Sequence, residues 1–171
     1  MPTEPRVRLE RPAPRHEQEY LAGVRRSRAL HRGFVTAAAT PSEYRDYLRR
    51  CRRRNQESFF VVRNDSGALV GVINVNEIVR YGFQSAYLGY YAFARHAGQG
   101  FMREGLTLVI DRAFGALGLH RLEANIQPAN GRSIALVRAL GFRLEGFSRR
   151  YLKIGGRWRD HERWALLADE W

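Results

Sequence analysis

Residues 87–106 read YLGYYAFARHAGQGFMREGL, and this stretch sets the architecture of the chain. Its first part, Tyr87–Phe93, is aromatic and apolar and is typical of a β-strand, while the apolar stripe further on predicts a helix that ends near Leu117. Between them lies a glycine turn, Ala97–Gly100. A strand that runs through such a turn into a helix presents several backbone N–H groups together with a helix N-terminus, which is a binding site for phosphate or pyrophosphate. The alternative interpretation is a tight turn that only feeds a helix.

The glycine turn is neither of the two commonest nucleotide-binding motifs. No Gly-Lys-Ser/Thr follows it, which excludes a P-loop. A dinucleotide-binding fingerprint requires a third glycine three positions after the second, and Arg103 occupies that position. Gly98 and Gly100 still let an anion approach the backbone, because neither carries a side chain. The turn therefore predicts an anion site of another kind.

Further elements are expected on both sides of this stretch. Upstream we expect one strand, two helices and a hairpin, at residues 7–11, at 15–30, from Pro41 onward, and at 58–63 with 68–76. Downstream we expect a strand, a short helix and a second hairpin, at residues 121–126, 133–140, and 147–154 with 157–166. This order of strands and helices predicts one mixed α/β domain over residues 1–171.

The composition excludes several classes of protein. Of the 171 residues 44% are hydrophobic, which suffices for a core and excludes wholesale disorder. No apolar stretch approaches the ~20 residues that span a bilayer, and residues 1–15 lack the apolar segment of a secretory signal. Cys51 is the single cysteine, which excludes an intramolecular disulfide, and the histidines lack metal-ligand spacing. We expect a soluble, cytoplasmic protein with no metal and no membrane partner.

The net charge of +12 arises from 29 lysines and arginines against 17 acidic residues, and Lys153 is the single lysine. Two interpretations are open: a basic surface that docks on nucleic acid or ribosomes, or an arginine-biased composition in which arginine fills solvated positions. The densest run, Arg49–Arg54, follows an apolar helical stripe of Tyr44, Tyr47, Leu48 and Cys51. A solvated helix face and a helix C-terminus account for this run, since the tyrosines lie on the opposite stripe.

Three stretches together resemble the GNAT superfamily of N-acetyltransferases. They are residues 87–106, HRLEANIQPANGRSIALVRALGF at 120–142 and EGFSRRYLKIGGRWRDHERWAL at 145–166. More narrowly they resemble its RimJ/RimL-type branch, which acetylates the N-terminal alanine of a ribosomal protein. The resemblance runs from about residue 73 to the C-terminus. It implies the GNAT fold, a central mixed, mostly antiparallel sheet of about seven strands with a splay between the fourth and fifth strands, flanked by helices.

The resemblance also implies acetyl-CoA as the donor and a set of residues that bind it. The pyrophosphate loop of the superfamily falls on six consecutive residues: Ala97, Gly98, Gln99, Gly100, Phe101 and Met102. Ala97 stands where the superfamily has Gln or Arg, and Arg95 or Arg103 is our candidate for the missing positive charge. The backbone around Tyr91, Ala92 and Phe93 corresponds to the strand that pairs with the pantetheine arm and donates to the thioester carbonyl. Asn130 corresponds to an asparagine that hydrogen-bonds the cofactor, and a helix cap is the alternative role for it.

The catalytic residues depart further from the superfamily pattern. The tyrosine that commonly serves as the acid falls on Val137, and Ser133 is the replacement that the resemblance implies. The alternative for Ser133 is a helix cap. Glu123 is the candidate base, with a surface ion pair to Arg121 as its alternative, and Glu77 is a second option.

The function that follows is acetyl transfer from acetyl-CoA to the α-amine of a protein N-terminus, of the ribosomal-protein alanine type, by direct attack in a ternary complex. An α-amine has an ordinary pKa of about 7.7–8.0 against about 10.4 for lysine, so a fair fraction of it is neutral near pH 7 and a modest base acting through water suffices. Two alternatives stay open. One is an acetyltransferase for a small amine such as an antibiotic, a polyamine or an amino acid. The other is a non-catalytic module that binds acyl-CoA or associates with ribosomes. The oligomeric state is also open.

Overall fold

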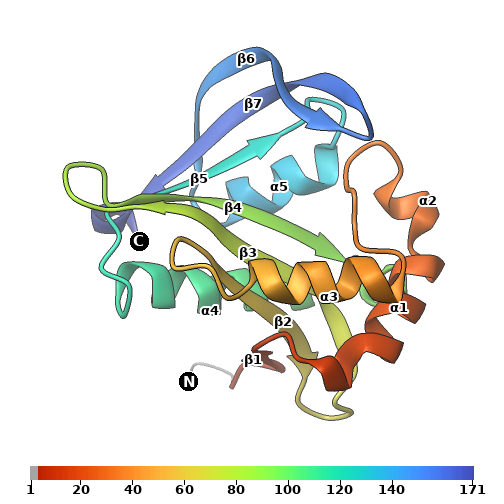
Figure 1. Cartoon of the computed structure of the whole chain (residues 1–171). Helices are drawn as coiled ribbons and strands as arrows, with labels where there is room; N and C mark the ends of the chain where they lie inside the picture. The colour runs from red at the N-terminus through yellow and green to blue at the C-terminus, as the bar shows by residue number, and fades with distance from the viewer. Residues whose placement is uncertain (1–3) are drawn as a thin grey trace.

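The computed structural model describes residues 4–171, which form a single curved sheet with helices on both faces (Figure 1). The strands in chain order are β1 Val7–Glu10, β2 Glu57–Arg63, β3 Leu69–Val79, β4 Ser85–Ala92, β5 Arg121–Ile126, β6 Arg143–Ile154 and β7 Arg157–Leu167. The α-helices are α1 Glu17–Arg26, α2 Arg28–His31, α3 Pro41–Arg50, α4 Phe101–Phe114 and α5 Gly131–Ala139. Short 3-10 turns lie at Pro14–His16, Ala94–His96 and Ala168–Glu170. No helix among residues 4–171 has the length and apolar character needed to cross a membrane.

The strand order in the sheet is β1-β2-β3-β4-β5-β7-β6. All neighbours are antiparallel except β4 and β5, which are parallel. The predicted GNAT sheet is therefore confirmed, with seven strands and one parallel pair at its centre.

The parallel pair is short, and this is what opens the sheet. β4 pairs with β5 only from Ser85 opposite Arg121 to Leu88 opposite Ala124. Beyond Leu88 the backbone of β4 continues to Ala92 beside β3 without a strand partner on its other side, within the described residues. The predicted splay between the fourth and fifth strands therefore begins after Leu88, and Figure 1 shows the two strands diverging there.

Two cores fill the two faces of the sheet. Helices α4 and α5 cover one face, and α1 and α3 cover the other. β2 shows how the sequence serves both, because its side chains alternate: Phe59 and Val61 enter the first core, Phe60 and Val62 the second. A strand that is buried on both faces has a continuous apolar sequence, in which apolar and polar residues do not alternate.

The helix expected over residues 15–30 is interrupted at Ser27. Its hydroxyl donates to the carbonyl of Gly23 at 2.7 Å and accepts from the backbone N–H of Ala94 at 2.8 Å. The backbone leaves helical geometry there, so α1 and α2 are separate helices. The interruption ties the N-terminal helices to the end of β4, next to the splay.

About a third of the arginines are used in ion pairs. Ten arginines contact carboxylates within 4 Å: Arg6, Arg8, Arg11, Arg15, Arg49, Arg63, Arg112, Arg121, Arg143 and Arg163. The exposed run Arg52–Arg54, directly after α3, makes no ion pair within the described part of the chain. Each surface ion pair of this kind adds little stability. The pairs therefore show where the charges lie and do not account for the stability of the fold.

Candidate active site

The glycine turn between β4 and α4 has the backbone geometry that an anion site requires. Gly98 and Gly100 have φ angles of 76° and 85°, in the left-handed region that favours glycine. Gly100 is the N-cap of α4 and, having no side chain, leaves the N–H groups of the first helical turn without a capping side chain. Three N–H groups at the positive end of a 14-residue helix can therefore point to a bound phosphate.

The side chains of the turn leave its backbone as the contact surface. Phe101 and Met102 are buried in the core beneath α4, so they can offer only N–H groups to a ligand. Arg95 is exposed beside the turn, and Arg103 lies at the start of α4 with its guanidinium 3.4 Å from the carbonyl of Ala139. Both arginines remain able to supply the positive charge that Ala97 lacks.

Arg6 is a contact of the turn that the sequence did not reveal. Its guanidinium donates to the carbonyl of Gln99 at 3.0 Å and to the carboxylate of Glu104 at 2.7 Å, and it lies 4.5 Å from the centre of the Phe101 ring. The segment before β1 thus holds the turn in place from a distance of 93 residues along the chain.

The end of β4 offers backbone groups to the splay. The N–H of Phe93 donates to the carbonyl of Val70 at 2.7 Å, so this residue faces β3. Because backbone groups alternate along a strand, Tyr91 also faces β3, while Tyr90 and Ala92 face the open side. The carbonyl of Ala92 accepts from Nε2 of His31 at 2.8 Å, and its N–H is turned to the splay. The backbone groups turned to the opening are therefore those of Ala92 and of Tyr90, which was not a predicted site residue, while those of the predicted Tyr91 and Phe93 face β3.

A cavity of about 640 Å³ fills the splay. Its lining comes from β3, β4, β5, the start of α5, β6, β7 and the segment 34–36. Tyr91, Asn130 and Ser133 are the predicted binding residues that line it, and Glu77 joins them. The predicted loop residues 95–102 and Glu123 do not contribute to the lining.

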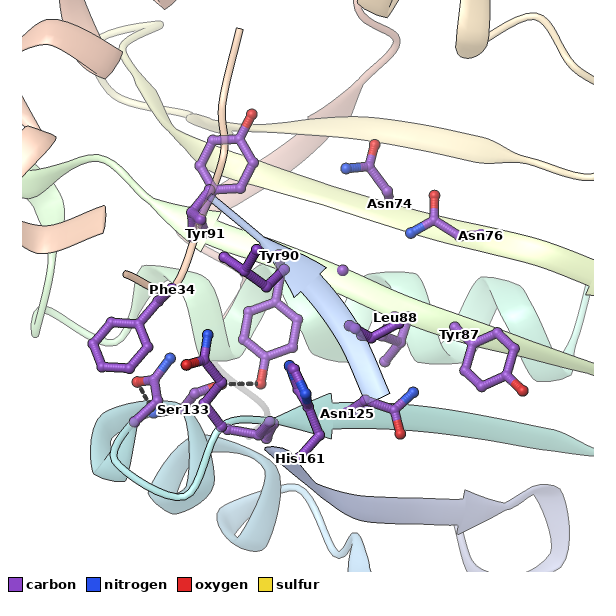
Figure 2. Close-up of a pocket in the computed structure, with 18 of the residues that line it drawn as sticks. Phe34, Asn74, Asn76, Tyr87, Leu88, Tyr90, Tyr91, Asn125, Ser133 and His161 are labelled. Atoms are coloured by element: carbon purple, nitrogen blue, oxygen red, sulfur yellow. Dashed lines mark hydrogen bonds between the residues drawn. The ribbon is translucent and has the colours of Figure 1, made fainter. Parts of the chain in front are cut away.

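Ser133 and Asn130 have distinct contacts at the start of α5. The side-chain oxygen of Asn130 accepts from the N–H of Ser133 at 3.3 Å, so Asn130 is the helix cap. The hydroxyl of Ser133 is therefore not needed as a cap. It lies 2.7 Å from the hydroxyl of Tyr90, with which it shares a hydrogen bond, as Figure 2 shows. Burial raises the pKa of Tyr90 to about 12, so this phenol keeps its proton throughout the neutral range.

The two carboxylates proposed as bases are differently placed. Glu123 on β5 accepts from Arg121 at 2.8 Å, and its other oxygen lies 3.6 Å from Arg163. This is the ion-paired arrangement that the alternative interpretation described. Glu77 on β3 is exposed at the cavity and accepts from the side-chain amide of Asn55 at 2.9 Å.

His161 is a further lining residue, and it was not a predicted site residue. It is 3% exposed, and its Nδ1 lies 2.9 Å from the carbonyl of Arg159. Figure 2 shows its ring projecting into the cavity on the side where the Tyr90 and Ser133 hydroxyls meet. The Gly-Arg-Trp-Arg-Asp-His ending was the sequence signal that could have singled it out. Residues 4–171 contain no group of three or more His, Cys, Asp or Glu side chains arranged to hold a metal ion.

Comparison with known proteins agrees with this geometry. The family model for the acetyltransferase (GNAT) domain matches residues 6–143. The chain is 33% identical over 134 residues to the probable N-acetyltransferase YjcK of Bacillus subtilis, covering 78% of this chain and 74% of that protein. It is 40% identical over 107 residues to the ribosomal protein uS5-alanine N-acetyltransferase of Escherichia coli, covering 63% of this chain and 55% of that enzyme.

Solved structures extend the comparison over nearly the whole chain. RimJ from Mycobacterium smegmatis in complex with CoA-disulfide superposes with a TM-score of 0.85 at 26% identity, covering 96% of this chain and 83% of that one. Spermidine N-acetyltransferase from Vibrio cholerae, with CoA and spermine, has a TM-score of 0.82 at 21% identity over 96% of this chain and 97% of that one, a likeness of fold. The chain therefore belongs to the GNAT acetyltransferase domain family and is an acetyl-CoA-dependent N-acyltransferase.

Proposed function

We propose that the chain transfers the acetyl group of acetyl-CoA to the α-amine of a protein N-terminus, of the ribosomal-protein alanine type. The observation that carries this proposal is the polarity of the splay cavity. Its polar lining includes the carboxamides of Asn74, Asn76, Asn125, Gln127 and Asn130. Carboxamides both donate and accept hydrogen bonds, which is what the N–H and C=O groups of a peptide require.

The same lining is poorly suited to a polyamine. A polycation requires several carboxylates, and Glu77 is the one carboxylate that lines the cavity within the described residues. That carboxylate already accepts from Asn55. A net charge of +12 adds a general repulsion toward a small polycation.

Asn125 gives the proposal a specific contact. It lines the cavity from β5, and its side-chain oxygen is buried without a hydrogen-bond partner in residues 4–171. A buried acceptor without a partner costs free energy, on the order of 1–3 kcal/mol. An N–H group of an incoming peptide would satisfy it.

The turn and the end of β4 fit the donor substrate. The uncapped N–H groups at the start of α4, with Arg95 or Arg103 beside them, suit the pyrophosphate of acetyl-CoA. The free N–H of Ala92, together with that of Tyr90, suits the pantetheine arm and the thioester carbonyl, where a fixed N–H stabilises developing negative charge. Asn130 and Ser133 lie on the far side of the same opening.

Tyr90 and Ser133 supply the proton or hydrogen bond that the leaving thiolate needs. Two hydroxyls 2.7 Å apart act as one donor, in which Ser133 faces the sulfur and Tyr90 supports it. Val137, at the position of the superfamily's usual acid, is fully buried and has no proton to give. The hydroxyl pair therefore takes the role that the missing tyrosine has elsewhere in the superfamily.

A panel of acceptor amines tests the proposal. Release of free thiol from acetyl-CoA is measured with a peptide that begins Ala-Arg, with the same peptide blocked at its N-terminus, and with spermidine. We expect turnover of the free peptide alone, because the blocked peptide keeps every side chain but lacks the α-amine. Faster turnover of spermidine would support the small-amine alternative. Tight binding of acetyl-CoA without thiol release for any amine would support the non-catalytic module.

A further inference from the structure

The histidine in the wall of the cavity has a fixed orientation and a fixed tautomer. Nδ1 of His161 lies 2.9 Å from the carbonyl of Arg159, and a carbonyl can only accept. Nδ1 must therefore carry the hydrogen, so that Nε2 of the neutral ring presents a lone pair. Nε2 has no hydrogen-bond partner among residues 4–171.

The topology explains why this side chain reaches the opening. β5 ends at Ile126, which pairs with Glu162 of β7. His161 is the adjacent residue of β7 and lies beyond the last β5 pair, where the sheet is open toward β4. On its other side a bulge in β6 between Ser148 and Leu152 brings the ring of Tyr151 to 6.2 Å from the ring of His161.

Few charged groups face this imidazole. Around it in the lining of the cavity are the carboxylate of Glu77 on β3, the phenols of Tyr87 and Tyr90 on β4, and the phenol of Tyr151 on β6. Two guanidinium groups, of Arg159 and Arg163, flank it on β7. The phenol of Tyr91 is bonded to Tyr20 on the other side of β4. The parts of β5, α5 and the segment 34–36 that line the cavity contribute no titratable side chain. Of the carboxylates, Glu77 is held by Asn55 and Glu123 by Arg121, which leaves the lone pair of His161 as the uncommitted base in the cavity.

We propose that Nε2 of His161 is the catalytic base that takes the proton from the acceptor amine, an inference that rests on the proposed function. The amine nitrogen forms a bond to the acetyl carbon and loses one proton to Nε2, while the carbon–sulfur bond breaks. The electron pair of that bond stays on sulfur, which is protonated from the pair of hydroxyls, Ser133 and Tyr90. Solvent then removes the proton from His161 and restores the one on the hydroxyl pair, so that atoms and charges balance.

The first test replaces His161 with glutamine. H161Q keeps a polar side chain of similar size but has no lone pair of comparable basicity, and we expect kcat to fall by about 10²–10⁴-fold with little change in the Kd of CoA. His120, an exposed histidine with no side-chain hydrogen bond in the described chain, gives the control variant H120Q, which should retain full activity. Imidazole added to H161A should restore part of the lost rate. A kcat of H161Q within about threefold of the parent enzyme would overturn the proposal, since a general base contributes far more than that.

The pH profile separates a base from a structural residue. In the acid range, kcat/KM of the parent enzyme should rise with the deprotonation of the acceptor amine and with the deprotonation of a base on the enzyme. H161Q should keep only the deprotonation of the amine. A structural role would lower the rate at every pH without changing the slope, and that outcome would count against the base.

The tautomer is measurable without turnover. Two-dimensional ¹H–¹⁵N correlation through the ring carbons, assigned with H161Q, should show a hydrogen on Nδ1 and a free Nε2 in the neutral ring. A hydrogen on Nε2 would exclude the proposal. If a small amine is the true acceptor, the proposed function fails, and the kcat values of H161Q and the parent enzyme are then compared with that amine as the acceptor. If no amine is acetylated, the proposed function fails and the observed tautomer decides for or against His161.

Discussion

The splay cavity lies along the unpaired part of β4 and the glycine turn follows the end of that strand, and the two regions are built in different ways. The turn is one contiguous run whose working parts are backbone N–H groups set by two φ angles. The cavity gathers side chains from five strands, one helix and two loop segments, 34–36 and the β5–α5 connection. A site of the first kind depends on local geometry and tolerates many side chains. A site of the second kind depends on the packing that brings distant residues together, and single side chains decide its chemistry.

We expect the largest effect from a substitution that changes the backbone conformation of the glycine turn. Gly98→Val places a β-branched residue at a φ of 76° and should move the N–H groups away from the pyrophosphate. With two charge-assisted hydrogen bonds lost, we expect CoA to bind about 10²–10⁴-fold more weakly by titration calorimetry. Gly67 in the β2–β3 turn has a φ of 71° and, like Gly98, open space on the side where a Cβ atom would lie, so Gly67→Val is the matched control. Equal CoA affinity in both variants would place the pyrophosphate elsewhere.

The second prediction concerns one pair of side chains in the cavity. Ser133→Ala and Tyr90→Phe should each lower kcat by about 10–10²-fold, since each weakens a hydrogen bond to a developing thiolate. The double variant should lose little more than either single one, because the two hydroxyls act together. Tyr44→Phe removes a buried hydroxyl that donates to the carbonyl of Ala13 at 2.8 Å, on the opposite face of the sheet and outside the cavity, and is the control. If the losses in the double variant were additive, the two hydroxyls would act independently of each other.

A smaller effect should follow from Glu123→Gln. Because Glu123 is paired with Arg121 and Arg163, we expect the free energy of unfolding to fall by about 1–3 kcal/mol in urea titrations. The accompanying loss of kcat should be smaller than that of Ser133→Ala. A loss of kcat larger than that of Ser133→Ala would assign the role of base to Glu123.

The smallest predicted effect is alkaline destabilisation. Burial raises the pKa of Tyr90 to about 12 and raises that of Tyr44 and Tyr47 as well. A pKa raised in the folded state contributes stability that is complete below the ordinary value near 10 and is lost above it. For Tyr90 alone the free energy of unfolding should fall by about 1 kcal/mol between about pH 10 and 11. Tyr90→Phe should make this fall shallower, and an identical slope would show that Tyr90 titrates normally.

These two regions also show how far the sequence could lead. Strand, turn and helix at residues 85–114 follow from local pattern, and so does the glycine requirement at 98 and 100. The sheet and its splay followed from the resemblance and are confirmed by the parallel pair that stops at Leu88. The Tyr90–Ser133 contact spans 43 residues and depends on how α5 packs beside β4, which no local pattern encodes. His161 was missed for a related reason, because its place beyond the end of β5 is set by strand register.

The identity of the acceptor amine is best tested within a single molecule. A peptide that begins with alanine and carries one internal lysine offers both kinds of amine to the enzyme, and mass spectrometry after brief incubation with acetyl-CoA locates the added acetyl group. The carboxamides of the cavity suit a peptide backbone, and an α-amine is neutral near pH 7 to a larger extent than a lysine amine, so we expect acetylation of the α-amine and an unmodified lysine. Acetylation of the lysine with a free α-amine would contradict the proposed function.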